Sequence, residues 1–143
     1  MPPKKILVVD DEDDIREIAS ISLDLTQGWE LRTASSGAEA IEIARDFEPD
    51  AILLDVMMPV MDGPSTLRML PPHIAVIFLT AKVQAADKHR FMQLGVRGII
   101  AKPFDPLTLA NQVAEMMQWG AESVEPRDES SDGGLDAQNP LAD

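Results

Sequence analysis

Short runs of apolar residues alternate with longer amphipathic stretches along most of this 143-residue chain. Three of the runs are apolar enough to be strands buried on both faces, namely Lys5–Val9, Ala51–Leu54 and Ala75–Leu79. Two weaker runs, Trp29–Ala34 and Val96–Ala101, complete a set of five. Alternation of strands and helices at this spacing predicts an α/β fold. Five parallel strands would form one doubly wound, flavodoxin-like sheet with right-handed crossovers and helices on both faces.

Helical patterns lie between these runs. Ser36 and Glu39 have the spacing of a capping box at the start of the second helix. Asp105-Pro106 predicts a cap and a first-turn proline for the last helix, which would stop at Gly120. The first helix is indicated by four residues that share one face, listed here: Ile15, Ile18, Ala19 and Ser22.

The two middle helices are less clear in the sequence. The helix that follows Gly63 must end before Pro71-Pro72, which leaves room for barely two turns. The stretch 84–94 offers only Phe91 and Leu94 to a core, and we predict a helix there because strands flank it and Gly95 follows.

Composition and charge limit what the chain can do. With 45% apolar residues it can bury one core, and we predict a single domain over residues 1–120. Residues 121–143 lack periodicity and carry seven acids against Arg127, so we predict a disordered acidic tail. A net charge of −13 argues against nucleic-acid binding. No signal peptide or membrane span is recognisable, so we expect a soluble, cytoplasmic protein.

Polar residues stand where the predicted strands end. Asp10 and Asp11 follow the first run, Asp55 the third, Thr80 the fourth and Lys102 the fifth. In a doubly wound parallel sheet, ligands bind at the carboxyl ends of the strands, so these side chains should converge.

Each of these residues also has an ordinary structural explanation. Acids after a strand favour the first turn of the next helix, and we prefer that explanation for Glu12, Asp13 and Asp14. Thr80 alone would be a strand-end hydroxyl, and Lys102 alone a surface lysine. Their convergence with three carboxylates favours a functional site.

The chemistry of this set points to phosphoryl transfer. Neighbouring carboxylates repel unless a cation lies among them, and a few carboxylates completed by water and phosphate are typical of Mg²⁺. An aspartate can accept a phosphoryl group as a nucleophile, and an ammonium and a hydroxyl can neutralise its oxygens. No serine–histidine pair of a hydrolase is recognisable.

Four motifs together resemble the receiver domain of two-component response regulators, the family that includes the chemotaxis regulator. They are residues 6–11, the segment 53–63 around Asp55, Thr80-Ala81 and Lys102-Pro103-Phe104. The resemblance covers residues 4 to about 119.

The resemblance implies specific roles for these residues. Asp55 would be the phosphoacceptor, and Lys102 and Thr80 would contact the phosphoryl group. Asp11, Asp55 and the backbone carbonyl of Met57 would bind Mg²⁺ directly, with Asp10 assisting through water. The Lys102-Pro103 peptide bond would be cis.

The resemblance also implies a signalling switch rather than an enzyme. A histidine kinase or a histidine phosphotransfer protein would phosphorylate it. A downstream protein would bind the face made by the fourth helix, fifth strand and fifth helix. The chain would be a monomer or a weak homodimer. We recognise no output domain after Gly120, so we expect the signal to leave by protein contact or by phosphoryl transfer to a histidine phosphotransfer protein.

Four features depart from the family pattern. Ile99 stands where an aromatic residue usually reports phosphorylation, and its stiff side chain cannot reproduce that rotation. Met57 and Lys82 occupy positions that affect dephosphorylation, and the third helix is short. Two alternatives therefore stay open: a phosphate sink or relay intermediate, and a pseudo-receiver that binds partners without phosphorylation.

Overall fold

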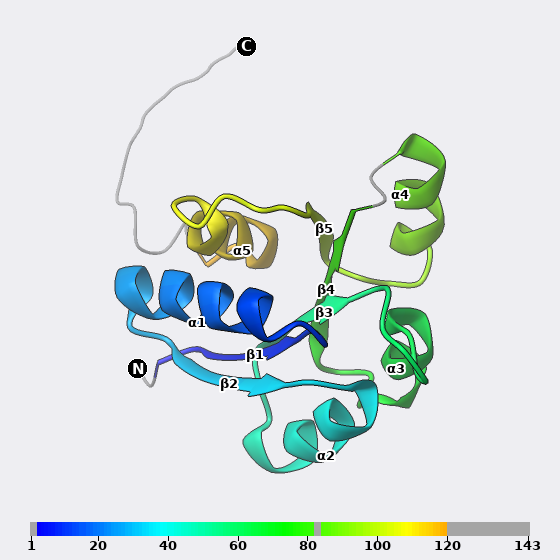
Figure 1. Ribbon diagram of the computed structural model, residues 1–143, viewed down its shortest axis with the longest axis horizontal. Helices are drawn as coiled ribbons and strands as arrows, with labels where there is room; N and C mark the ends of the chain where they lie inside the picture. Colours follow the sequence, from blue (N-terminus) through cyan, green and yellow to red (C-terminus); the bar gives the residue numbers. More distant parts are fainter. Residues whose placement is uncertain (1–2, 82–83, 120–143) are drawn as a thin grey trace. The chain divides into compact units, whose positions relative to one another are not determined.

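A computed structural model describes residues 3–81 and 84–119, and the chain divides into two compact units, Met1–Ala110 and Asn111–Asp143. Five strands and five helices alternate within the described residues (Figure 1). The strands are β1 (Lys5–Val9), β2 (Glu30–Ala34), β3 (Ala51–Asp55), β4 (Ala75–Thr80) and β5 (Gly98–Ala101). The helices of the first unit are α1 (Asp13–Gln27), α2 (Gly37–Phe47), α3 (Gly63–Met69) and α4 (Ala85–Met92). Helix α5 (Leu109–Met117) crosses the boundary between the units.

The five strands form one parallel sheet in the order β2-β1-β3-β4-β5. The chain therefore moves outward from β1 to β2 and then returns past β1 to β3. This reversal between β1 and β3 is where ligands bind in folds of this type. The order and the parallel pairing confirm the doubly wound, flavodoxin-like fold that the sequence predicts.

The core lies on both faces of the central strands. Every residue of β3 is buried, and Ile6 to Val9 of β1 have no exposed surface. On one face, buried side chains of α2 and α4 pack with alternate residues of the sheet, and the rings of Phe78 and Phe91 meet edge to face with centroids 5.3 Å apart. Helix α1 lies on the opposite side of β1 and β2 from α2 (Figure 1). Helices on both faces explain why the central strands are apolar throughout.

Local signals set most helix starts. In α2, the Ser36 hydroxyl accepts a hydrogen bond from the Glu39 N–H (3.1 Å), as predicted. The Glu39 carboxylate turns to the Ser35 N–H at 2.7 Å. In α3, the Asp62 carboxylate accepts from the Ser65 N–H at 2.8 Å. These bonds hold the pKa values of Glu39 and Asp62 below their usual range.

Three details differ from the sequence expectations. Helix α5 begins at Leu109 because Asp105 closes a turn first, accepting from the N–H groups of Leu107 (2.9 Å) and Thr108 (3.1 Å). Ile18 and Leu94, which we expected to face the core, are 42% and 41% exposed. The apolar pattern identifies the helices but not the depth at which each residue is buried.

Several expectations concern residues that the structure does not describe. The tail of residues 121–143 and Lys82 lie outside the described part of the chain, and the predicted boundary near residue 120 stays a prediction. Among the described helices, none combines the length and the apolar character needed to cross a membrane.

Candidate functional site

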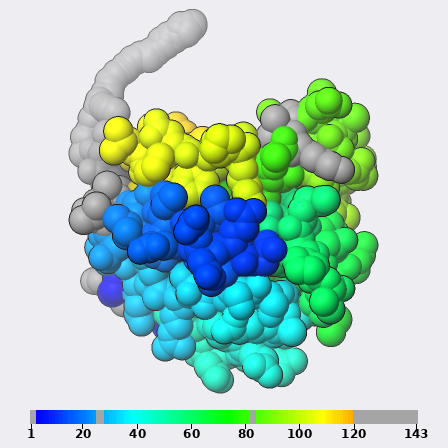
Figure 2. Space-filling view, in the orientation of Figure 1, coloured from blue at the N-terminus to red at the C-terminus, as the bar shows by residue number. Residues whose placement is uncertain are grey.

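Four of the predicted polar residues meet at the carboxyl ends of the strands. Asp55 and Thr80 are the last residues of β3 and β4, Asp10 follows β1, and Lys102 follows β5. The Lys102 N–H donates to the Thr80 carbonyl oxygen at 2.9 Å, which places Lys102 beside β4. Figure 2 shows that the dark-blue segment after β1 borders both the green segment after β3 and the yellow segment after β5.

The Lys102 ammonium joins two buried carboxylates. Its Nζ atom is 3.1 Å from Asp10 Oδ2 and 3.1 Å from Asp55 Oδ1. Asp10 is fully buried and Asp55 is 2% exposed, so water does little to screen the repulsion between the two carboxylates. Buried charges of one sign require a counter-charge, and Lys102 provides it.

Asp10 is fixed through all of its polar groups. Its N–H donates to the Ala34 carbonyl (3.1 Å), and its own carbonyl accepts from Arg16 Nη1 (2.7 Å). Its carboxylate accepts from the Glu12 N–H through Oδ1 (2.9 Å) and from Lys102 through Oδ2. Asp10 is therefore held by the sheet, by α1 and by the residue after β5 at once.

Asp55 is held differently. Its Oδ1 atom accepts from Lys102 and, at 3.4 Å, from the Met57 N–H. Its Oδ2 atom accepts no hydrogen bond from the residues that the structure describes. One oxygen of Asp55 is thus oriented and the other is available for chemistry.

The remaining predicted ligands lie at the surface of this cluster. The Asp11 side chain is exposed, and within residues 3–81 and 84–119 its carboxylate makes no hydrogen bond or ion pair. Met57 is 62% exposed, and its N–H donates to Asp55 Oδ1. The contribution of the Met57 carbonyl as a metal ligand stays a prediction.

Burial changes the acidity of the central residues. Desolvation raises the pKa of Asp55 to about 6, and the charge of Asp10 adds to this, while Lys102 partly opposes it. For Lys102, burial lowers the pKa, but hydrogen bonds to Asp10 and Asp55 outweigh burial, and the pKa is raised. The pair Asp55–Lys102 is therefore charged at neutral pH, and Asp55 takes up a proton only below about pH 6.

The carboxylates fit a hard divalent cation. One oxygen from each of Asp10, Asp11 and Asp55 lies within 4.8 Å of the others. Ligand oxygens on opposite sides of a Mg²⁺ ion are about 4.2 Å apart, because each bond is about 2.1 Å long. The spacing of the three carboxylates is thus close to that of a Mg²⁺ site, and all their donors are oxygens, as Mg²⁺ prefers.

Two further residues support the site, Gly63 of the motif around Asp55 and Arg16, to which the sequence assigns no role. Gly63 lies so close to β3 that an added Cβ would be 2.8 Å from the Asp55 carbonyl oxygen and from Val56 Cα. Its N–H donates to the Val56 carbonyl at 2.9 Å. Arg16 donates to the Asp10 carbonyl, as described above. Gly63 appears in the motif around Asp55, which is a signal, whereas nothing in the sequence marks Arg16.

The structure also shows Ile99, which stands in place of the usual aromatic residue, and the Lys102-Pro103 peptide bond. Ile99 of β5 is partly buried and packs against the core cluster shared by α2 and α4. The Lys102-Pro103 peptide bond is cis, as the resemblance implies.

The fold and the polar cluster define a class of protein. Residues 6–114 match the family model of the response regulator receiver domain. The chain belongs to this family.

Individual relatives are consistent with this assignment. The chain is 38% identical over 117 residues to the probable transcriptional regulator ycf27 of Cyanophora paradoxa, covering 80% of this chain and 48% of that protein. It is 34% identical over 143 residues to the alkaline phosphatase synthesis transcriptional regulatory protein PhoP of Bacillus subtilis, covering 98% and 59%. The chain thus spans about half the length of these curated relatives.

Among solved structures, the chemotaxis protein CheY4 of Vibrio cholerae has a TM-score of 0.73 and 33% identity. That match covers 80% of this chain and 98% of the other. The BeF3-activated receiver domain of DrrB has a TM-score of 0.71 and 26% identity, and the match covers 81% of this chain and 98% of the other.

Proposed function

We propose that this chain is a phosphorylation-controlled signalling switch that accepts a phosphoryl group on Asp55 with Mg²⁺ bound beside it. The observation that carries the proposal is the Lys102 ammonium, 3.1 Å from both Asp10 and Asp55 at the switch point of the sheet. A buried cation at this point is suited to neutralise charge on a transferring phosphoryl group. Membership of the receiver family supports the same role.

Each residue of the site would have a separate role in the transfer of a phosphoryl group to Asp55. The Oδ2 atom of Asp55 attacks phosphorus while the bond from phosphorus to the donor's leaving group breaks, and the leaving group keeps the electron pair. Lys102 neutralises the transferred group, and the Thr80 hydroxyl donates a hydrogen bond to one of its oxygens. Asp10, Asp11 and Asp55 would hold Mg²⁺, with the Met57 carbonyl as a further ligand. The ion would supply positive charge to the phosphoryl oxygens.

We further propose that the donor is a histidine kinase or a histidine phosphotransfer protein. The added charge, up to about two units, would draw Thr80 and Lys102 toward Asp55 and shift the binding surface between two populations. The face of the fourth helix, fifth strand and fifth helix as the docking site for a downstream partner stays a prediction.

Intact-protein mass after incubation with acetyl phosphate tests the proposal. We expect a gain of about 80 Da, the mass of one phosphoryl group, that requires Mg²⁺. Asp55→Asn should show no gain. Asp46→Asn, which removes an exposed carboxylate on α2, should gain as the wild type does. A wild-type protein that gains nothing with Mg²⁺ would refute phosphorylation of Asp55.

One observation favours the pseudo-receiver as a second candidate. Ile99 packs against the core and cannot rotate as an aromatic side chain does, so the usual coupling to the surface is lacking. The two candidates differ in whether phosphorylation of Asp55 changes the amide NMR shifts of β5 and α4. Shifts that change only around Asp55 would favour the pseudo-receiver.

A further inference from the structure

Arg16 lies beside the three carboxylates of Asp10, Asp11 and Asp55, which we call the acidic cluster. Its guanidinium contacts the main chain of Asp10 and is paired with none of these carboxylates. Its Nη1 atom donates to the carbonyl oxygen of Asp10 at 2.7 Å. Its Nη2 atom pairs with the carboxylate of Asp13, three residues earlier on α1. The Arg16 side chain is only 19% exposed, whereas that of Asp13 is 90% exposed. The buried end of this interaction is therefore the carbonyl, not the ion pair.

The carbonyl that Arg16 holds belongs to the peptide unit between Asp10 and Asp11. Because a peptide unit is planar, fixing its oxygen fixes the plane and hence the direction in which Asp11 leaves the main chain. Asp10 needs no such help, since its N–H and both carboxylate oxygens have other partners. Asp11 is exposed, and among the described residues its carboxylate makes no hydrogen bond or ion pair. Arg16 is thus the side chain that holds the peptide unit from which Asp11 extends.

A guanidinium suits this task because its donors are rigidly spaced and always charged. One donor reaches the Asp10 carbonyl, and the other is anchored on the first turn of α1 by Asp13. The arrangement ties the β1–α1 turn to the helix that follows it. Charge alone acts in the opposite direction, because a cation close to the acidic cluster repels a metal ion.

We propose that Arg16 is a positioning residue for the divalent-cation site, and that it acts by holding the Asp10–Asp11 peptide unit so that Asp11 faces Asp55. The inference rests on the proposed Mg²⁺ site. It gives Arg16 a role that strengthens Mg²⁺ binding although the side chain carries a positive charge.

The test is the Mg²⁺ dissociation constant, measured by isothermal titration calorimetry on the full chain after removal of metal with a chelator. Arg16→Met should weaken Mg²⁺ binding about tenfold, the size of effect seen when a residue that orients a metal ligand is lost. Arg16→Lys keeps the charge but not the fork of donors, and it should fall between Arg16→Met and the wild type.

Two control variants separate positioning from a general loss of stability. Arg90 on α4 also pairs with an aspartate three residues earlier, Asp87, at 3.0 Å. Arg90→Met removes the same kind of ion pair and should leave Mg²⁺ binding unchanged. Leu23→Ala truncates a fully buried side chain of α1, and it should lower the melting temperature but not the affinity. In Arg16→Met alone, the amide NMR signals of Asp11 and Glu12 should shift before Mg²⁺ is added.

Each outcome decides the matter. Tighter Mg²⁺ binding by Arg16→Met would mean that only the charge of Arg16 matters, and it would overturn the proposal. Unchanged binding would overturn it as well. A wild-type protein that binds no Mg²⁺ would overturn both this inference and the proposed function. A wild-type protein that binds Mg²⁺ and an Arg16→Met variant that binds equally well would leave the proposed function standing.

Discussion

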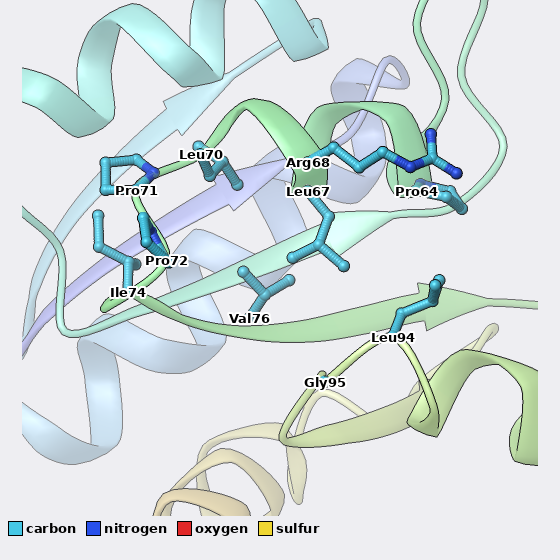
Figure 3. A pocket seen from close by; sticks show the side chains of 10 residues that line it. All are labelled: Pro64, Leu67, Arg68, Leu70, Pro71, Pro72, Ile74, Val76, Leu94 and Gly95. Carbon is cyan, nitrogen blue, oxygen red and sulfur yellow. The ribbon is translucent and has the colours of Figure 1, made fainter.

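The two ends of the sheet differ in how they use buried space. At the carboxyl end, Asp10, Asp55 and Thr80 are buried polar residues, and Lys102 bridges the two carboxylates. Near the start of β4, Ile74 and Val76 lie in an open groove of about 450 Å³ that extends along α3 to Pro64 and is lined mainly by apolar side chains and prolines (Figure 3). There, Leu67 and Val76 point toward one another.

This difference indicates that the functional site lies at the carboxyl end of the sheet. Buried charge lowers stability unless each group has a partner, so it persists where it serves a function. Apolar residues that line a groove need no such explanation, because packing accounts for them. Substitutions at the carboxyl end should therefore change chemistry and stability together, whereas those at the groove should change stability alone.

The largest effect should come from removing the central cation. Lys102→Met leaves Asp10 and Asp55 buried together, so we expect the free energy of unfolding at pH 8 to fall by about 3 kcal/mol. The loss should be smaller at pH 5, because Asp55 then takes up a proton. Urea unfolding at the two pH values measures both. Lys88→Met, at an exposed lysine of α4, should have little effect at either pH. An equal loss at pH 5 and pH 8 would contradict the assigned role of Lys102.

A smaller effect on stability, with none on chemistry, should follow from Ile74→Ala in the groove. Ile74 is 8% exposed, so its truncation should cost about 2 kcal/mol, the low end for such changes, because the open groove limits the cavity left behind. The Mg²⁺ dissociation constant should stay within about twofold of the wild type, since Ile74 precedes β4 and so lies at the opposite end of that strand from Thr80. Met69→Ala, at a 61% exposed residue of α3, is the control for stability. A clear loss of Mg²⁺ affinity in Ile74→Ala would remove the contrast between the two ends.

Two glycines test the same contrast, because Gly63 packs against Asp55 and Gly95 lines the groove. Replacing each with alanine adds one methyl group. Gly63→Ala would force Cβ to within 2.8 Å of main-chain atoms of Asp55 and Val56, and we expect a loss of about 1–3 kcal/mol together with weaker Mg²⁺ binding. Gly95→Ala meets no atom within 4 Å, but its φ of +95° is strained for alanine. Its cost should be about 1 kcal/mol, with Mg²⁺ binding unchanged. Urea unfolding and calorimetry on both variants provide the measurements, and equal Mg²⁺ affinities would show that Gly63 does not support the site.

The residues at the strand ends could be predicted because their meeting depends only on topology. Once strands are parallel, their carboxyl ends lie at one edge, and Asp10, Asp55 and Lys102 follow from where the apolar runs stop. The short α3 was likewise set by Pro71-Pro72.

What the sequence did not reveal depends on contacts between segments. Arg16 donates to the main-chain carbonyl of Asp10. Because every residue has such a carbonyl, the sequence contains no pair of side chains from which this hydrogen bond could be predicted. The late start of α5 arises because Asp105 accepts from Leu107 and so forms a turn of its own. Exposure of Ile18 and Leu94 reflects the depth of packing, which periodicity alone does not encode.

The smallest predicted effect is the pH dependence of Mg²⁺ binding. Burial raises the pKa of Asp55 to about 6, so below that pH a metal ion must displace a proton. The Mg²⁺ dissociation constant should rise by up to about tenfold for each pH unit below 6 and should be nearly constant above pH 7. Calorimetric titrations from pH 5 to pH 8 measure this.

Protonation of Asp55 also changes the stability of the fold. Between about pH 4 and pH 6 the folded chain binds more protons than the unfolded chain, so the contribution of Asp55 to stability decreases as pH rises through that window.

Other titrating groups can be separated from Asp55. The pKa values of Glu39 and Asp62 are lowered by hydrogen bonds from Ser35 and Ser65, whereas burial raises that of Asp55, so the two caps change charge at lower pH than Asp55 does. The titrations should also be repeated with His73 and His89 replaced by Gln, and the pH dependence of Mg²⁺ binding should not change. Asp55→Asn removes the buried proton site, so its unfolding free energy should lack the decrease between pH 4 and pH 6. An Mg²⁺ affinity that stays constant from pH 5 to pH 7 would show that Asp55 is not the ligand whose protonation competes with the metal, and the contrast between the charged and the apolar end would then rest on Asp10 and Lys102 alone.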